Sequence, residues 1–317
     1  MKRFLLLAAL VCPAILAQTL DDPVILTVEV ANSVIYRGTV FDATKIAKDP
    51  GPTTSANQAF IEAMNLGDIV SVNGKPVKGI WSSSVLAMPY RANPQPGQPI
   101  ADFDLAGTNF CTWQFYDTDG NFLGMLRDSG AGQGHAIVGT LGGFFGVTGM
   151  HQGGTTITAQ RQASTAEDPA NRRTLGGGSN TVVFYLYPTV RPAIVTTSSG
   201  PAITHSDYSP VTAANPVRPG ETLILAATGL GTVRPNLDPP GAITFSNSPL
   251  QVVNAPVSVV FNGHELPVTS KFGWPGQKTV YWVDFQVPAD AAAGTATIQL
   301  IATWIPGPTV TVPVGSH

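Results

Sequence analysis

The chain has 317 residues, about the length of two domains on the usual basis of roughly 150 residues each. Charged residues make up 12% of the sequence, about half the usual share of roughly 25%, and the formal net charge is −3. No basic cluster appears, which excludes electrostatic recruitment by nucleic acid or by an anionic membrane surface. With 43% hydrophobic residues, 33 glycines and 27 prolines, the chain has material for a core but favours many short strands over long helices.

The N-terminus has the pattern of a cleaved secretory signal. Two basic residues at positions 2 and 3 precede an apolar stretch that ends in small residues at Ala17. The stretch is shorter than the roughly 20 residues that a membrane-spanning helix needs, so residues 1–17 are predicted to be removed by cleavage near Ala17. We expect a secreted protein, periplasmic or extracellular, without a membrane anchor. Cleavage also removes Cys12 and leaves Cys111 as the one cysteine, so no internal disulfide is predicted.

Residues 18–187 are predicted to form a first domain that is almost entirely strand. Its hairpin turns are marked by Asn73-Gly74 and Asp119-Gly120, because Asn, Asp and Gly tolerate the positive φ angles of tight turns. Apolar residues alternate with polar ones from Cys111 to Tyr116, which predicts a strand with one apolar face. The predicted strands lie at residues 24–30, 68–72, 76–81, 111–116, 122–126, 135–139 and 181–187.

One helix and two loops are predicted between these strands. A capping pattern precedes apolar residues at helical spacing up to Met64, and Gly67 follows, which predicts a helix over residues 54–67. The proline-rich residues 93–99 and the glycine-rich residues 164–179 are predicted to be exposed loops.

A second domain follows a proline-rich segment. Residues 188–219 contain six prolines and few large apolar groups, so they are predicted to be a semi-extended linker that merges into the start of the second domain. Strand-like segments then alternate with turns, among them Asn262-Gly263, over residues 220–317, a pattern typical of an immunoglobulin-like β-sandwich. The predicted strands of this domain lie at residues 221–228, 257–261, 279–285, 295–303 and 309–314.

The first domain carries a family resemblance over Gly107–Tyr116 and Gly134–Gly149. In these segments an apolar strand ends in a glycine-rich turn, an aromatic residue and a further glycine, which resembles the late strands of the allene oxide cyclase and dirigent barrels. The resemblance implies a small antiparallel β-barrel with an apolar lumen for one small hydrophobic ligand. Members of these families direct cyclisation or radical coupling with a few acidic, arginine or tyrosine side chains. Those side chains lie in early strands that do not align with this chain residue by residue, so none is carried over.

The second domain carries another resemblance, over residues 213–215, 218–221, 227–231 and 283–288. These segments resemble the C-terminal module of secreted proteins of Acidobacteria, especially the Solibacter group. That module resembles other immunoglobulin-like repeats, which implies a spacer or an adhesive unit with a cell-surface or polysaccharide contact. Together the two halves predict an all-β chain, in which a small antiparallel β-barrel is followed by an immunoglobulin-like β-sandwich.

The candidates for a ligand site in the barrel are Glu29, Tyr116, Arg127 and His135. If the Glu29 face of strand 24–30 points into the lumen, Glu29 is a pocket acid and burial raises its pKa. If that face points to solvent, Glu29 is an ordinary exposed glutamate, and this interpretation is favoured. Arg127 and Asp128 are either polar neighbours of Glu29 or part of a solvated rim.

Three other patterns are interpreted without chemistry. Residues 117–121 have the oxygen-rich composition of a calcium loop, but a hairpin turn explains them and the distant glutamate of a calcium site is missing. His135 and His151 flank the glycine-rich turn and can approach each other across neighbouring strands, yet they are interpreted as rim histidines. Cys111 shares a strand face with Trp113 and is interpreted as a core thiol, not a nucleophile. No metal site and no cofactor is predicted.

The leading functional hypothesis is a non-catalytic secreted binding module, in which the barrel holds a small hydrophobic molecule and the second domain serves as spacer. One alternative is a dirigent or cyclase type of enzyme that steers a reactive intermediate in the lumen. Another is a cell-surface structural protein whose barrel is filled by side chains. An open apolar lumen with Glu29, Arg127 or Tyr116 pointing inward would favour chemistry, and a packed lumen would argue against both ligand-based hypotheses.

Overall fold

The computed structural model describes residues 22–37, 61–87, 108–131, 134–152, 154–235 and 244–316. The predicted signal segment and the predicted loop at residues 93–99 lie outside the described residues. The described part confirms the all-β prediction, because it consists of two large sheets, a two-stranded one and a short 3₁₀ helix, η2 (Pro169–Arg173). Among these residues, no helix is long and apolar enough to cross a membrane.

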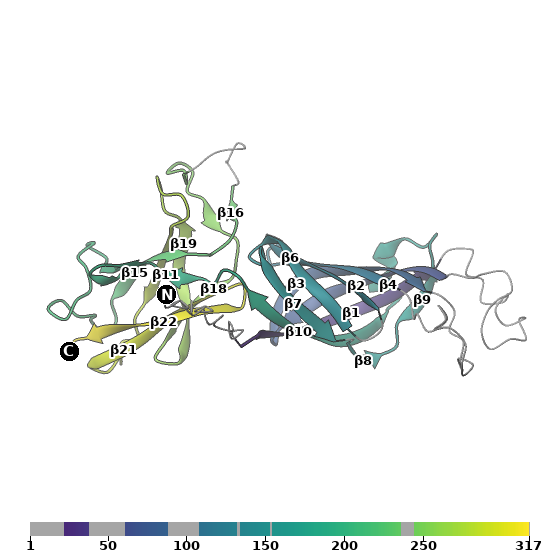
Figure 1. The fold of residues 1–317 in the computed structure, drawn as a ribbon, viewed down its shortest axis with the longest axis horizontal. Coiled ribbons are helices and arrows are strands. Elements are labelled where there is room, and N and C mark those ends of the chain that lie inside the picture. Colours follow the sequence, from purple (N-terminus) through teal and green to yellow (C-terminus); the bar gives the residue numbers. More distant parts are fainter. Residues whose placement is uncertain are drawn as a thin grey trace, which may run out of the picture.

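Eight antiparallel strands of the first domain close into a barrel, which forms one end of the elongated molecule (Figure 1). The strands follow each other around the barrel in chain order up to β7, and β10 then pairs with both β7 and β1. Closure leaves these strands without a free edge. The barrel strands are β1 (Val24–Arg37), β2 (Ile61–Val72), β3 (Lys75–Ala87), β4 (Thr108–Tyr116), β5 (Phe122–Ala131), β6 (Gly134–Gly142), β7 (Val147–Gln152) and β10 (Gly178–Pro188). Two short strands flank the barrel, β8 (Thr155–Thr158) beside β10 and β9 (Arg161–Ser164) parallel to β1.

The hairpin turns lie where the sequence predicted them. Asn73 and Gly74 connect β2 to β3, and both have positive φ angles, of 51° and 74°. In the turn between β4 and β5, Asp117 Oδ1 accepts the backbone N–H groups of Asp119 and Asn121 at 3.0 and 2.7 Å. The Asp117 carboxylate therefore serves the turn itself, as Asp side chains commonly do.

The helix predicted over residues 54–67 is wrong for the part of it that is described. Residues 61–67 belong to strand β2, which pairs with β1 on one side and β3 on the other, and residues 54–60 lie outside the described part. Met64, expected on an apolar helix face, is 47% exposed. A side chain at Gly67 would begin only 2.5 Å from Val30, so Gly67 is a point of close packing between strands and not a helix terminus. Pairing on both sides of the strand overrides the local helical spacing.

Large apolar side chains occupy much of the barrel interior. Alternation directs every second residue inward, and on β1 the inward residues are Val24, Leu26, Val28 and Val30. Phe115 and Phe184 are fully buried, and the ring of Trp113 meets that of Phe184 edge-on at 4.9 Å between centroids. The apolar part of the interior is therefore filled by side chains.

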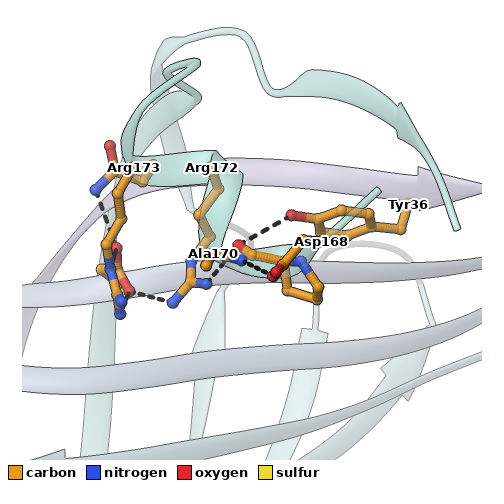
Figure 2. Close-up of polar contacts among 8 residues, drawn as sticks. Tyr36, Asp168, Ala170, Arg172 and Arg173 are labelled. Carbon is orange, nitrogen blue, oxygen red and sulfur yellow. Dashed lines mark hydrogen bonds and ion pairs between the residues drawn. The ribbon is translucent and has the colours of Figure 1, made fainter. Parts of the chain in front are cut away.

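The segment predicted as a loop at residues 164–179 instead contains η2 and the start of β10. Asp168 caps η2 by accepting the backbone N–H of Ala170 at 2.8 Å. Arg172 and Arg173 reach from η2 to the carboxylate of Asp68 on β2, at 2.5 and 2.8 Å (Figure 2). Burial alone would raise the pKa of Asp68, but hydrogen bonds from Arg173, Asn32 and Arg172 hold it below its ordinary value. This ion cluster fixes η2 against the outer wall of the barrel.

The second domain forms a sheet that nearly closes on itself around one core, which is consistent with the predicted β-sandwich. The strand order along the main path is β11-β15-β20-β19-β18-β21-β22. These strands are β11 (Ala193–Ile194), β15 (Thr222–Thr228), β18 (Val257–Phe261), β19 (His264–Gly273), β20 (Tyr281–Gln286), β21 (Gly294–Ala302) and β22 (Ile305–Val314). The shorter pieces are β12 (Thr196–Thr197), β13 (Gly200–Pro201), β14 (Ile203–His205), β16 (Val233–Arg234) and β17 (Val252–Val253).

Most of the segment predicted as a linker, residues 188–219, belongs to the second domain. Strands β11 and β14 both pair with β15, and Ile194, Ile203 and Val217 are buried in the core of the second domain. These few apolar residues, spaced between prolines, are enough to anchor the segment because each lies at a paired or bridged position. The connection between the domains is therefore shorter than predicted.

One end of the barrel is closed by the turn between β21 and β22. Ile305 is buried within the barrel core, and the Trp304 ring lies 6.1 Å from that of Phe115 and 6.2 Å from that of Phe144. Thr303 packs directly on Gly143, because a Cβ atom added at Gly143 would overlap the hydroxyl oxygen of Thr303. We call Thr303, Trp304 and Ile305 the interdomain plug. Through this plug the second domain contributes side chains to the barrel core.

Candidate functional site in the barrel interior

Three of the four side chains predicted to bind a ligand do not line the interior. Glu29 is exposed on the outer wall, where its carboxylate accepts the hydroxyl of Ser71 at 2.6 Å, which corresponds to the solvent-facing interpretation. Arg127 is also exposed, and the Tyr116 hydroxyl donates to Gln114 on the same outer face at 3.0 Å. Apolar residues occupy the inward positions of these strands. Because side chains alternate between the two faces, the polar residues between them point to the outer wall.

The fourth predicted residue, His135, points inward. It lies opposite His151 in the pairing of β6 with β7, each is 5% exposed, and their rings stack at 4.6 Å between centroids. The two histidines thus meet across neighbouring strands as the sequence allowed, but inside the barrel and not on a solvated rim. Alternation explains this placement, because His135 shares its face with the buried Ile137.

Asp128 on β5 connects the two histidines. Its side chain is completely buried, and its two carboxylate oxygens lie 2.8 Å from His135 Nδ1 and 3.1 Å from His151 Nε2. The indole N–H of Trp113 donates to the same carboxylate at 2.5 Å. Burial alone would raise the pKa of Asp128, but its contacts with His151, Trp113 and Cys111 hold the pKa below the ordinary value. A buried carboxylate is therefore kept ionised by its neighbours.

Cys111 completes what we call the buried polar cluster: Cys111, Asp128, His135 and His151. It lies opposite Asp128 in the pairing of β4 with β5, and its Sγ, a carboxylate oxygen of Asp128 and a ring nitrogen of His135 all lie within 4.8 Å of one another. Burial, and then the charge of Asp128, raises the pKa of the Cys111 thiol to about 12. At neutral pH the thiol is therefore protonated, which agrees with its interpretation as a buried core residue and not as a nucleophile.

The proton on His151 is assigned by its other contact. His151 Nδ1 lies 3.0 Å from the carbonyl oxygen of Gln152, and because a carbonyl only accepts, Nδ1 is the donor. The other ring nitrogen, Nε2, faces Asp128 Oδ2 at 3.1 Å. This atom is buried and, among the described residues, has no hydrogen-bond partner of good geometry.

Other buried polar atoms nearby also lack partners. Asn65 Oδ1, Trp81 Nε1 and Asn180 Oδ1 have no hydrogen-bond partner within the described part of the chain. Asn65 pairs with the inward-facing Ser83, and Asn180 pairs with the inward-facing Val30. Leaving such an atom unsatisfied costs about 1–3 kcal/mol, and these three lie at inward positions of the barrel. Arg172, Thr204 and Thr303, outside this region, also carry unpartnered buried atoms.

The buried polar cluster lies toward the end of the barrel remote from the interdomain plug. Gly143, which packs on Thr303, donates its backbone N–H to Leu123 on β5. Asp128 is five residues farther along the same strand, about 17 Å away at roughly 3.4 Å per residue. The interior is thus apolar and closed at one end and polar toward the other.

The outer wall over the same strands carries a hollow of about 540 Å³. Arg127 borders it together with the exposed apolar side chains of Met64, Phe110 and Val138. The hollow is open to solvent. Cys111 and Asp128 of the buried polar cluster also border it, so the hollow lies directly over the strands that carry the cluster.

From the sequence, His135 was a site candidate and His151 was interpreted as a rim histidine. Asp128 was interpreted either as a polar neighbour of Glu29 or as part of a solvated rim. Strand alternation was the signal that could have placed Asp128 inside the barrel. Leu126 points inward, and Asp128, two residues later on β5, lies on the same face. Comparison of the chain with protein-family models, with curated proteins and with solved structures finds no match.

Proposed function

We propose that this is a secreted binding protein whose barrel holds a small polar ligand at the buried polar cluster. The observation that carries the proposal is the set of unpartnered polar atoms at inward positions around Asp128. A ligand with donors and acceptors of its own would satisfy these atoms, and each satisfied atom recovers about 1–3 kcal/mol. The secreted location rests on the N-terminal pattern of the sequence alone.

The filled apolar interior argues against the small hydrophobic ligand expected from the sequence, so the proposal keeps a binding module but changes the expected character of its ligand. A small hydrophobic molecule would need the apolar half of the interior, which Trp113, Phe115 and Phe184 fill. The remaining inward groups are imidazole, carboxylate, thiol and amide, and these recognise polar or charged partners. The interdomain plug closes the other end of the interior.

Native mass spectrometry of the full-length mature protein, purified from its source, tests the proposal. We expect a low-molecular-weight species that stays with the folded protein and is lost on unfolding. The variant Asn65→Leu removes one unpartnered acceptor with little change in volume and should release the retained species. In the ligand-free protein the same variant should raise the free energy of unfolding by about 1–3 kcal/mol, because an unsatisfied buried atom is removed.

The matched control is Glu29→Gln, which changes a carboxylate on the outer wall of the same barrel. It should leave both the retained mass and the stability unchanged. If wild-type protein carries no bound species, and Asn65→Leu leaves the stability of that protein unaltered, the unpartnered atoms do not form a binding site and the proposal is wrong.

A further inference from the structure

We infer that the buried polar cluster binds a divalent transition-metal ion of the zinc class, with Cys111, Asp128 and His135 as ligands and His151 as an additional donor. The first three residues each offer a ligand atom, a sulfur, a carboxylate oxygen and an imidazole nitrogen, and these atoms lie within 4.8 Å of one another. Metal–ligand bonds of about 2.0–2.3 Å bring ligand atoms to such separations with only small side-chain movements.

The second, independent observation is the state of His151. His151 is 5% exposed, its Nδ1–H donates to the carbonyl oxygen of Gln152, and its Nε2 faces Asp128 without a hydrogen-bond partner among the described residues. Metal-binding histidines commonly show this arrangement, in which the second ring nitrogen donates to a backbone carbonyl and fixes the ring orientation. A metal ion beside Asp128 would give Nε2 the partner that the described residues do not supply.

Further contacts orient the central ligand. The Trp113 indole N–H donates to Asp128 Oδ2, which fixes the orientation of the carboxylate, while Oδ1 faces His135 Nδ1 at 2.8 Å. The mixture of thiol, imidazole and carboxylate favours zinc or a similar borderline ion over magnesium or calcium, which prefer sets made of oxygen atoms alone. On binding, the Cys111 Sγ–H bond breaks, the proton passes to solvent, and the sulfur lone pair forms the metal–sulfur bond.

The second domain supplies a contrast within the same chain. His205 is equally buried and its Nδ1 lies 2.8 Å from a carboxylate oxygen of Glu221. Its Nε2, however, lies 3.2 Å from the carbonyl oxygen of Asn215, so both ring nitrogens have an acceptor. No cysteine accompanies it among the described residues. We interpret this histidine–carboxylate pair, in which both ring nitrogens have a partner and no thiol is present, as structural, and it is the matched control.

The inference rests on the site of the proposed function, because it names an occupant of the same cluster, but the two can fail separately. Metal binding without a retained organic molecule would leave the inference standing and overturn the small-molecule proposal. A retained organic molecule in a protein that binds no metal would do the reverse.

The test uses untagged, full-length mature protein, freed of metal by a chelator under reducing conditions and titrated with Zn²⁺ by isothermal calorimetry. We expect one ion per chain. Cys111→Ser and His135→Gln should weaken binding at least about tenfold, with a smaller loss for His151→Gln, since donor and orienting residues are commonly worth about 10–100-fold in affinity. His205→Gln should bind as the wild type does.

Titration of wild-type protein with Co²⁺, followed by absorption spectroscopy, tests the thiolate ligand without relying on a variant that could fail to fold. A thiolate-to-cobalt charge-transfer band should appear and saturate at one equivalent, and it should be absent in Cys111→Ser. The inference is overturned if wild-type protein binds no stoichiometric Zn²⁺, if its cobalt complex lacks the thiolate band, or if Cys111→Ser and His135→Gln bind as tightly as His205→Gln.

Discussion

The two ends of the barrel interior differ in chemical character, although the same strands run through both: one end is mainly apolar and the other contains ionisable side chains. At the plugged end, Phe144 packs between Phe115 and Trp304, and the buried Thr303 packs on the neighbouring Gly143. At the other end, Asp128 is buried among two histidines and a thiol. Apolar packing is non-directional and stabilises the fold directly, whereas a buried ionised group is retained only when its contacts offset its desolvation. We therefore expect the apolar end to contribute most to stability, and the polar end is where we propose that the ligand binds.

The largest expected effect comes from the plugged end. Phe144→Ala removes a fully buried ring and should lower the free energy of unfolding by about 3–5 kcal/mol, measured by denaturant titration. The neighbouring Phe145 is 73% exposed, so Phe145→Ala should change stability by less than about 0.5 kcal/mol. Equal losses for the two variants would contradict the assignment of this end as the stabilising core.

A smaller effect is expected from the polar end. Asp128→Asn keeps the shape of the side chain but removes the charge, and hydrogen bonds to charged groups are worth about 1.5–3 kcal/mol each. We expect a loss in that range in the presence of a chelator. The adjacent Arg127 points to solvent, so Arg127→Gln is the control and should be close to neutral. A gain in stability for Asp128→Asn would mean that desolvation of the carboxylate outweighs its contacts.

A pH titration separates the outer wall from the interior. The pKa of Asp68 is lowered by its arginine partners, so its folded-state pKa lies below the unfolded value of about 3.9. The stability it contributes is present above that unfolded pKa and is lost as the pH falls through the folded pKa. The difference in stability between wild type and Asp68→Asn should therefore be constant near neutrality and shrink below about pH 4. A difference that persists at lower pH would show that Asp68 acts through packing, not through its charge.

The smallest effect is expected at the surface between the domains. Lys75 and Glu265 form an ion pair at 2.7 Å, but their side chains are 59% and 42% exposed. A double-mutant cycle with Lys75→Ala and Glu265→Ala should give a coupling energy below about 1 kcal/mol that disappears at high salt. A larger coupling would mean that this pair, and not the interdomain plug, holds the domains together.

The sequence was sufficient for features that depend on local pattern. Alternation and the Asn-Gly and Asp-Gly turns located most strands, because a period of two and a positive φ are properties of short segments. The same local reasoning failed at residues 61–67, where a helical spacing coincides with a strand paired on both sides.

The remaining site depended on register between distant strands. Asp128 meets Cys111 through the pairing of β4 with β5, and His135 meets His151 through the pairing of β6 with β7. A shift of one residue in either pairing would send these side chains to the outer wall, and the chain offers no local signal that fixes the register. The interdomain plug was also beyond local reasoning, because Trp304 acts on residues almost two hundred positions earlier.

The turn at Thr303 and Trp304, with φ angles of 51° and 63°, has a consequence for how such chains are rearranged in evolution. A domain that merely follows another can be exchanged for a different copy by recombination at the linker. Here a turn of the second domain closes one end of the barrel. A replacement second domain would therefore need a turn that packs on Gly143 and Phe144 in the same way. A chimaera that exchanges the second domain without this turn would leave the barrel open at its base and exposed to aggregation.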